Sequence, residues 1–140
     1  ARHLAFSSGY MYCVNELVSS VTVFKYDGEN TRLIKTYPAV PADFTGDNLA
    51  AAIRIRDNKL YISNRGHNSI AVFEICGESL ELKGYIPVGK EPRDFNIFDE
   101  ALISADMADN RVTFYKLNGF NAEKLDTVIE NIKEPLCVLV

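Results

Sequence analysis

The sequence predicts an all-β fold: a β-propeller made of about three four-stranded blades and one further inner strand. Two observations predict it. The same pattern of four short strand-like runs occurs three times within the 140 residues. Equivalent residues of successive units lie 49 and then 42 positions apart, which is a typical spacing for propeller blades. An unrelated all-β meander or sandwich is the alternative, and the threefold alignment favours the propeller.

Each unit divides into four strands in chain order. The first runs are "LAF", "AAIRI" and "FNI", and the second are "YMYCV", "KLYIS" and "ALISA". The third are the clearest, because "NELVSSVTVFKYDG", "NRGHNSIAVFEICG" and "DMADNRVTFYKLNG" align without gaps. The fourth are "TRLIKTYP", "LELKGYIPV" and "EKLDTVIEN". Alternating faces and many β-branched and aromatic residues indicate strands. Only "DNLAAAIRI" has the composition for a helical turn, and its alignment with "ARHLAF" and "PRDFNIF" favours a strand.

The predicted units are blades over residues 1–43, 44–90 and 91–133, followed by the inner strand of a closing blade over residues 134–140. That last segment, "EPLCVLV", aligns with "EPRDFNI". Three blades cannot close the usual ring of four to eight. We therefore expect a C-terminal portion of a longer propeller, or a chain that assembles with another copy. The expected partners are the remaining N-terminal blades or that other copy, bound through open blade edges.

Composition narrows the class of protein. The chain has 15 basic and 19 acidic residues, which argues against a nucleic-acid surface. No run approaches the roughly 18 apolar residues of a membrane helix, and the first residues do not resemble a signal peptide. Cys13, Cys76 and Cys137 form no C-x-x-C pair. We expect them to be reduced and mostly buried, in a cytoplasmic protein.

Several polar residues are expected at one mouth of the central channel. In an antiparallel blade, the start of the inner strand and the turn between the second and third strands lie at the same end. Two sets of residues occupy these places: Arg2, His3, Arg93 and Asp94 at the strand starts, and Glu16, Arg65, His67, Asp109 and Asn110 in the turns.

Each of these residues also has a purely structural interpretation. Arg2 and Arg93 could pair with carboxylates between blades, and Glu16 could be a solvated turn residue. The imidazole of His3 could find its hydrogen-bond partners on the inner strand. That of His67 could bond to the backbone of its own turn. For Asp109 and Asn110 we favour plain turn chemistry.

Other common sites are absent from the sequence. It contains no Gly-rich phosphate loop, no G-x-S-x-G motif and no zinc-ligand spacing. Its two histidines are 64 residues apart and make a poor metal site. We therefore predict neither a metal nor a cofactor. The chain also lacks tryptophan, and with it the WD dipeptide typical of WD40 interaction platforms.

The strings "DFTGDNLAAAIRI", "NKLYISNRGHNSIAVFEI" and "GKEPRDFNI" resemble the lactonase family of seven-bladed propellers, the 6-phosphogluconolactonase type related to carboxymuconate cyclases. The resemblance covers essentially the whole chain. It implies a catalytic site at the channel mouth, in which Arg2, Glu16 and Arg65 match the family's arginine, glutamate and arginine. The histidine usually counted with them belongs to an earlier blade. We take His3, His67, Arg93 and Asp94 as candidates for substrate binding.

The resemblance implies hydrolysis of a small, phosphorylated sugar-acid lactone in the pentose phosphate pathway. Arginines bind phosphate or carboxylate and can stabilise the oxyanion of a tetrahedral intermediate, and a glutamate or histidine can activate water. Two alternatives stay open. One is a lactone-forming cyclase of the carboxymuconate type, and the other is a non-catalytic propeller that binds a partner or a small anion. We expect little activity from these 140 residues alone.

Overall fold

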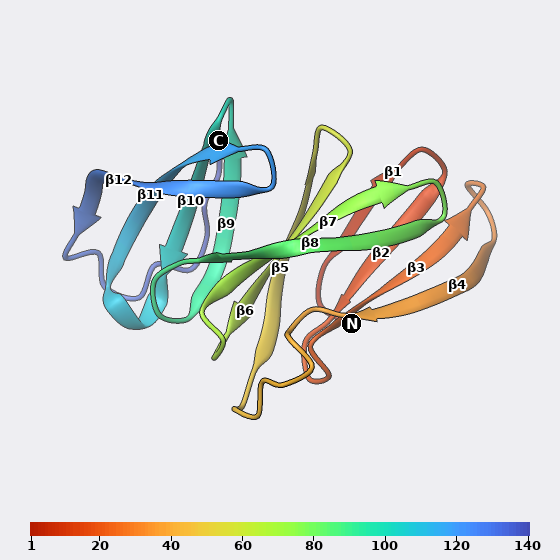
Figure 1. The fold of residues 1–140 in the computed structure, drawn as a ribbon, viewed down its shortest axis with the longest axis horizontal. Coiled ribbons are helices and arrows are strands. Elements are labelled where there is room, and N and C mark those ends of the chain that lie inside the picture. Colours follow the sequence, from red (N-terminus) through yellow and green to blue (C-terminus); the bar gives the residue numbers. More distant parts are fainter.

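The computed structural model describes residues 1–140 and consists of three four-stranded antiparallel sheets, each built from consecutive strands (Figure 1). The first sheet contains β1 (Leu4–Ser7), β2 (Tyr10–Asn15), β3 (Ser20–Tyr26) and β4 (Thr31–Pro38). The second contains β5 (Leu49–Arg56), β6 (Lys59–Arg65), β7 (Ser69–Cys76) and β8 (Ser79–Pro87). The third contains β9 (Pro92–Phe98), β10 (Ala101–Asp106), β11 (Arg111–Asn118) and β12 (Asn121–Glu130), with the short 3-10 turn η1 (Met107–Asp109) before β11. The predicted fold class is confirmed: the sheets are propeller blades.

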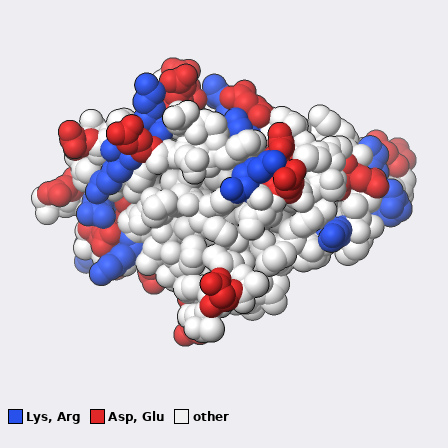
Figure 2. All heavy atoms as spheres, in the orientation of Figure 1, with Lys and Arg blue, Asp and Glu red and all other residues white.

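The second sheet lies between the other two (Figure 1). Its inner strand β5 contacts both β1 and β9, so the first strands of the three blades stand next to one another. On the face seen in Figure 2, acidic and basic side chains are mixed at the two ends and along the upper edge, a small group of both signs lies near the centre, and uncharged atoms cover most of the rest. No helix of the structure has the length and apolar character needed to cross a membrane.

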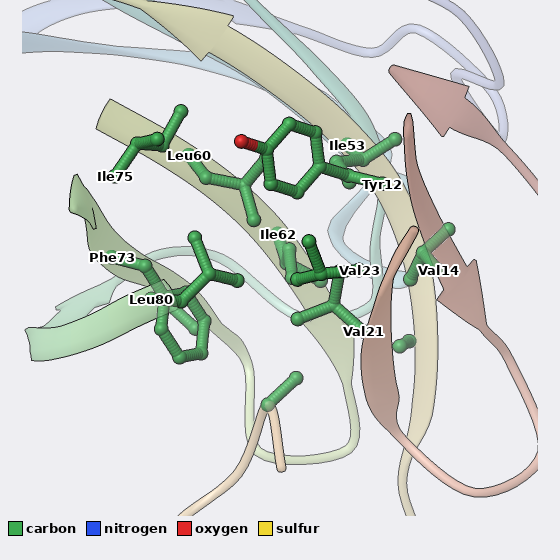
Figure 3. Packing of buried hydrophobic residues seen from close by; sticks show 13 residues of the cluster. Tyr12, Val14, Val21, Val23, Ile53, Leu60, Ile62, Phe73, Ile75 and Leu80 are labelled. Carbon is green, nitrogen blue, oxygen red and sulfur yellow. The ribbon is translucent and has the colours of Figure 1, made fainter. Parts of the chain in front are cut away.

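Two apolar clusters hold the blades together, one on each side of the middle sheet. The first joins β2 and β3 to the middle sheet, where Tyr12 and Val23 face Leu60, Ile62 and Phe73 (Figure 3). The second joins the middle sheet to the third, and its largest buried rings include Tyr61, Phe95 and Tyr115. Because both faces of the middle sheet are covered, β7 is buried along most of its length, whereas β4 and β12 are mostly exposed.

One expectation from the sequence is wrong and another stays a prediction. Residues 134–140 form no strand in this chain, which holds no further strand to pair with them, and their role as the inner strand of a closing blade stays a prediction. Side chains of β9 hold this segment instead: the Val138 N–H donates to Asp94 Oδ2 at 2.9 Å, and the Val138 carbonyl accepts from Asn96 Nδ2 at 3.2 Å. Of the three cysteines, only Cys13 is buried; Cys76 and Cys137 are exposed, and all three are free thiols.

Candidate functional site

The inner ends of the first two blades bring together three side chains that are distant in sequence. Arg2 precedes β1 and is fixed to β2 by backbone hydrogen bonds, from the Arg2 N–H to the Val14 carbonyl at 2.9 Å and from the Val14 N–H to the His3 carbonyl at 3.0 Å. Glu16 lies in the turn after β2, and Arg65 is the last residue of β6. Strand starts and turns therefore meet at one end, as the antiparallel order requires.

A single carboxylate oxygen joins the two arginines. Arg2 Nη1 lies 2.7 Å from Glu16 Oε1, and Arg65 Nη2 donates to the same oxygen. Glu16 and Arg65 are equivalent residues of neighbouring blades, 49 positions apart. The ion pair therefore crosses the boundary between the two blades and ties their inner ends together.

This cluster is half-buried and carries an excess of positive charge. The Arg65 side chain is only 9% exposed, and the Nε atoms of Arg2 and Arg65 are buried without a hydrogen-bond partner. Burial acts to raise the pKa of Glu16, but the hydrogen bond from Arg65 and the charge of Arg2 outweigh it and leave that pKa below its usual value. The carboxylate is ionised at neutral pH, and the two guanidinium groups have donors to spare for an anion.

A second ion pair lies further along the inner strands. Arg54 Nη2 on β5 lies 2.9 Å from Asp94 Oδ1 on β9, and the Asp94 side chain is 7% exposed. The other Asp94 oxygen accepts the Val138 N–H. Asp94, a predicted substrate-binding residue, thus links the inner strand β5, the inner strand β9 and the C-terminal segment.

Sequence reasoning missed Arg54. The residue stands between Ile53 and Ile55 in a strand that is otherwise apolar in its first half. A charge inside such a run was the available signal, since charged side chains are rarely buried without a partner. Its partner could not be identified from spacing, because Asp94 lies 40 residues away.

His3 follows Arg2 in the chain, and the charges of both ion pairs act on its ring. Burial is the largest cause that lowers its pKa, and the charges of Arg2 and Arg54 lower it further, while Asp94 and Glu16 act in the opposite direction. The net result is a pKa below the usual value of histidine. The His3 ring is therefore largely neutral at neutral pH, and a neutral imidazole can accept a proton.

Arg93 has the same place in the third unit as Arg2 in the first, but it does not join the cluster. It falls in a β-bulge, where Asp94 pairs with Ala105 and Pro92 pairs with Asp106. The residue equivalent to Glu16 in this blade is Met107, so Arg93 has no carboxylate across the turn. No ion pair or side-chain hydrogen bond engages it in the structure.

His67 is held away from the cluster. Its Nδ1 lies 2.7 Å from Ser69 Oγ, and its ring stands edge-on to Phe44 and Tyr85, with centroid distances of 4.9 and 5.2 Å. Tyr85 belongs to the outer strand β8, so this histidine faces the outer part of the blade. The backbone N–H of His67 donates to Asn48 Oδ1 at 3.0 Å, which ties this turn to the segment before β5.

The turn residues Asp109 and Asn110 have the structural contacts that we favoured for them. Asp109 Oδ2 accepts the Lys90 N–H at 2.8 Å and pairs with Arg111 Nη2 at 3.1 Å. Asn110 adopts a left-handed conformation and its Oδ1 accepts the Glu134 N–H at 2.9 Å.

One group of potential metal ligands, Glu74, Cys76 and Glu81, lies on β7 and β8. The Lys83 ammonium stands 2.9 Å from a carboxylate oxygen of each glutamate. This single ammonium offsets part of the negative charge of the two glutamates and already engages one oxygen of each.

Comparison with known proteins gives consistent matches. The model of the family described as "Lactonase, 7-bladed beta-propeller" matches residues 1–140. A 6-phosphogluconolactonase of Pectobacterium carotovorum is 38% identical over 127 residues, which cover 84% of this chain and 38% of that protein. An uncharacterised protein of Staphylococcus aureus strain USA300 is 36% identical over 127 residues, covering 84% of this chain and 37% of that protein.

A solved structure shares the fold closely. The periplasmic gluconolactonase PpgL of Pseudomonas aeruginosa superimposes with a TM-score of 0.89 at 25% identity, covering 96% of this chain and 40% of that chain. The present chain thus spans about two-fifths of the length of the relatives it matches.

Proposed function

The chain belongs to the lactonase family of seven-bladed β-propellers, and from this premise we propose that the protein that carries it hydrolyses a sugar-acid lactone. The substrate class is a phosphorylated lactone of the 6-phosphogluconolactone kind, a step of carbohydrate metabolism in the pentose phosphate pathway. We place the activity in the cytoplasm, where three free thiols are stable.

The observation that carries the proposal is the pair of guanidinium groups that Arg2 and Arg65 hold on the Glu16 carboxylate. Their remaining N–H groups suit the phosphate and the ester carbonyl of such a lactone. A guanidinium forms planar, bidentate contacts with a phosphate. It also stabilises the negative charge that develops on a carbonyl oxygen during attack by water.

The charge at the inner strands supports an anionic substrate. Arg2, Arg54, Arg65 and Arg93 lie on or beside these strands, and the carboxylates among them are Glu16 and Asp94. The local balance is positive, although the chain as a whole has a net charge of −4. A locally positive surface on an acidic protein raises the local concentration of a small anion.

The test is lactone turnover by the whole protein, with spontaneous hydrolysis subtracted. We expect Arg65→Ala to lower kcat/KM by about 10² or more, the size of the loss when a transition-state donor is removed. Arg56→Ala is the matched control: Arg56 is also an arginine of the middle blade, but its side chain is 43% exposed and pairs only with Asp57 at the far end of β5.

Two results would contradict hydrolysis. Binding of 6-phosphogluconate without turnover of its lactone would indicate a non-catalytic, anion-binding propeller. Formation of a lactone from a carboxymuconate, without hydrolysis of the sugar-acid lactone, would indicate a cyclase.

A further inference from the structure

One amide side chain joins the turn that carries Glu16 to the turn that carries Arg65. Asn48 lies in the segment between β4 and β5, where the chain passes from the first blade to the second. Its Nδ2 donates to Ser19 Oγ at 2.8 Å in the first blade and to Asn64 Oδ1 at 3.1 Å in the second. The Ser19 hydroxyl in return donates to the Asn48 carbonyl at 2.9 Å. The Asn48 amide thus bridges the same boundary that the ion pair of Glu16 and Arg65 crosses.

The same side chain holds the backbone on both sides of Arg65. Asn64, the residue before Arg65, is fully buried and accepts one Asn48 N–H. His67, two residues after Arg65, donates its backbone N–H to Asn48 Oδ1 at 3.0 Å. Between them, a Cβ on Gly66 would overlap the carbonyl oxygen of the residue before Asn48, so the turn packs directly against this segment. These contacts leave the backbone of Arg65 little freedom to move.

Glu16 is held by the other end of the bridge. The Ser19 N–H donates to the Glu16 carbonyl at 3.3 Å, and Ala50, two residues after Asn48, donates its N–H to the same carbonyl at 3.1 Å. Ser19 is only 6% exposed, so its two hydrogen bonds with Asn48 are shielded from water. The positions of both charged residues therefore depend on the segment that contains Asn48.

The boundary between the second and third blades lacks this bridge. Lys90 is the equivalent of Asn48, 42 positions further along the chain. It bonds through its backbone only: its N–H donates to Asp109 Oδ2 at 2.8 Å, and its carbonyl accepts the Ala108 N–H at 3.3 Å. The turn at this boundary carries Met107 instead of an arginine. The side-chain bridge thus occurs where an arginine and a carboxylate meet, and it is missing where they do not.

We propose that Asn48 is a positioning residue for Arg65, an inference that rests on the proposed lactone hydrolysis. Asn48 fixes the turn from which the Arg65 guanidinium reaches Glu16 and the substrate, and it does not itself contact the lactone. Because the Arg65 side chain is only 9% exposed, a small shift of the turn changes the direction in which its donors point. A displacement of about 1 Å at a reacting centre can cost about 10²-fold in rate.

The experiment is a double-mutant cycle on kcat/KM for 6-phosphogluconolactone in the whole protein. Asn48→Ala alone should lower kcat/KM by about 10-fold or more. In a protein that already carries Arg65→Ala, the same change should lower kcat/KM no further, because Asn48 acts through Arg65. Equal losses in the two backgrounds would show a purely structural role and overturn the inference.

Asn58→Ala is the matched control for loss of stability. Asn58 Nδ2 donates to the Ile75 carbonyl at 2.8 Å at the far end of the middle blade, and its φ is 59°. Alanine at this position loses a hydrogen bond and adopts a disfavoured backbone conformation. The variant should be less stable and should keep the kcat/KM of the unaltered protein. A fall in kcat/KM equal to that of Asn48→Ala would also overturn the inference.

A second readout does not depend on turnover. The Arg65 Nε–H is buried without a hydrogen-bond partner, and its NMR resonance is assigned by its disappearance in Arg65→Ala. Asn48→Ala should shift this resonance and speed its exchange with water, whereas Asn58→Ala should do neither. An unchanged resonance in Asn48→Ala would overturn the positioning role. Absence of lactone turnover in the unaltered protein would instead refute the proposed hydrolysis itself.

Discussion

Asp106 is a fully buried carboxylate at the end of β10, and its equivalents in the first two blades are amides. Its oxygens accept hydrogen bonds from Ser104 Oγ and Thr113 Oγ1, both at 2.6 Å. Asn15 has the same place in the first blade and donates to Ser20 Oγ and Thr22 Oγ1 at 3.0 and 2.9 Å. Burial raises the pKa of Asp106, and the hydrogen bonds from Ser104 and Thr113 and the charge of Arg111 only partly oppose it.

We expect Asp106→Asn to raise the free energy of unfolding at pH 7. A carboxyl whose pKa is higher in the folded state than in the unfolded state weakens the fold wherever it is ionised, and this penalty disappears as pH falls through the folded pKa. The gain should therefore shrink as pH falls through the folded pKa and vanish well below the unfolded value of about 3.9, where both states are protonated. Urea denaturation at several pH values measures it. Asp126→Asn, on the exposed face of β12, is the control and should show no such dependence.

The sequence predicted which residues would share one end of the blades, but not which of them would touch. Arg2, Glu16 and Arg65 were expected to converge, and their side chains are in contact; their place at a channel mouth and their catalytic roles stay predictions. The Arg54–Asp94 pair was not foreseen. Strand order determines at which end of a blade a residue lies. Whether a long side chain reaches across a blade boundary depends on how the two blades pack, and the sequence of one repeat does not reveal that packing.

At the scale of elements, the turns between the second and third strands fasten each blade to the segment that follows it. Ser19, Asn68 and Asn110 occupy equivalent positions, and all three have a positive φ of 46°, 55° and 51°. Their carbonyls accept the N–H groups of the residues after the outer strands, Ala39, Val88 and Ile132, at 2.8, 3.0 and 3.1 Å. The same contact thus recurs in every blade and directs the chain back to the inner end.

Asn68 makes a side-chain hydrogen bond in addition to this backbone contact: its Oδ1 accepts the Glu91 N–H at 3.0 Å. We expect Asn68→Ala to reduce the free energy of unfolding by about 2 kcal/mol, from a left-handed backbone that alanine disfavours and from the lost hydrogen bond. Asn68→Gly keeps the backbone conformation free of strain and should cost only about 1 kcal/mol. Chemical denaturation of both variants tests this; equal losses would show that the conformation of the turn is unimportant.

The strands themselves were predictable because the repeat shows each one three times. Residues 134–140 show the limit of that inference. They align with an inner strand, yet they form none in the structure. A strand is defined by its partner as much as by its own residues, and alignment carries no information on whether that partner is present.

At the scale of the molecule, the first and third sheets each have one face that no further sheet covers (Figure 1). Leu4 and Phe6 on β1 are 52% and 54% exposed, and Phe98 on β9 and Leu136 are 57% and 58% exposed. Exposed apolar side chains that gather on one face of a protein often mark an interaction surface. These two faces are the surfaces through which we propose that the chain meets neighbouring blades or another copy.

We expect the isolated 140-residue chain to associate in solution, with a sedimentation coefficient that rises with protein concentration. Replacing Leu4 and Phe6 by Lys should weaken this association, because a charge at each position opposes burial of the face. Leu82→Lys is the control, since Leu82 is 43% exposed but lies on the outer strand of the middle blade. A chain that stays monomeric at all concentrations and unfolds cooperatively would show that the uncovered faces do not drive association.

The ion pair between Glu16 and Arg65 has a consequence for protein engineering. The two residues are copies of one position in the repeat, and the third copy is Met107. If every blade were built from one consensus repeat, as in consensus design of repeat proteins, this position would hold the same residue in every blade. Neighbouring copies would then carry like charges or none, and the contact between them would be lost. A regularised version of this chain would therefore lose the charge pair on which the proposed anion site depends, because that pair exists only where neighbouring repeats differ.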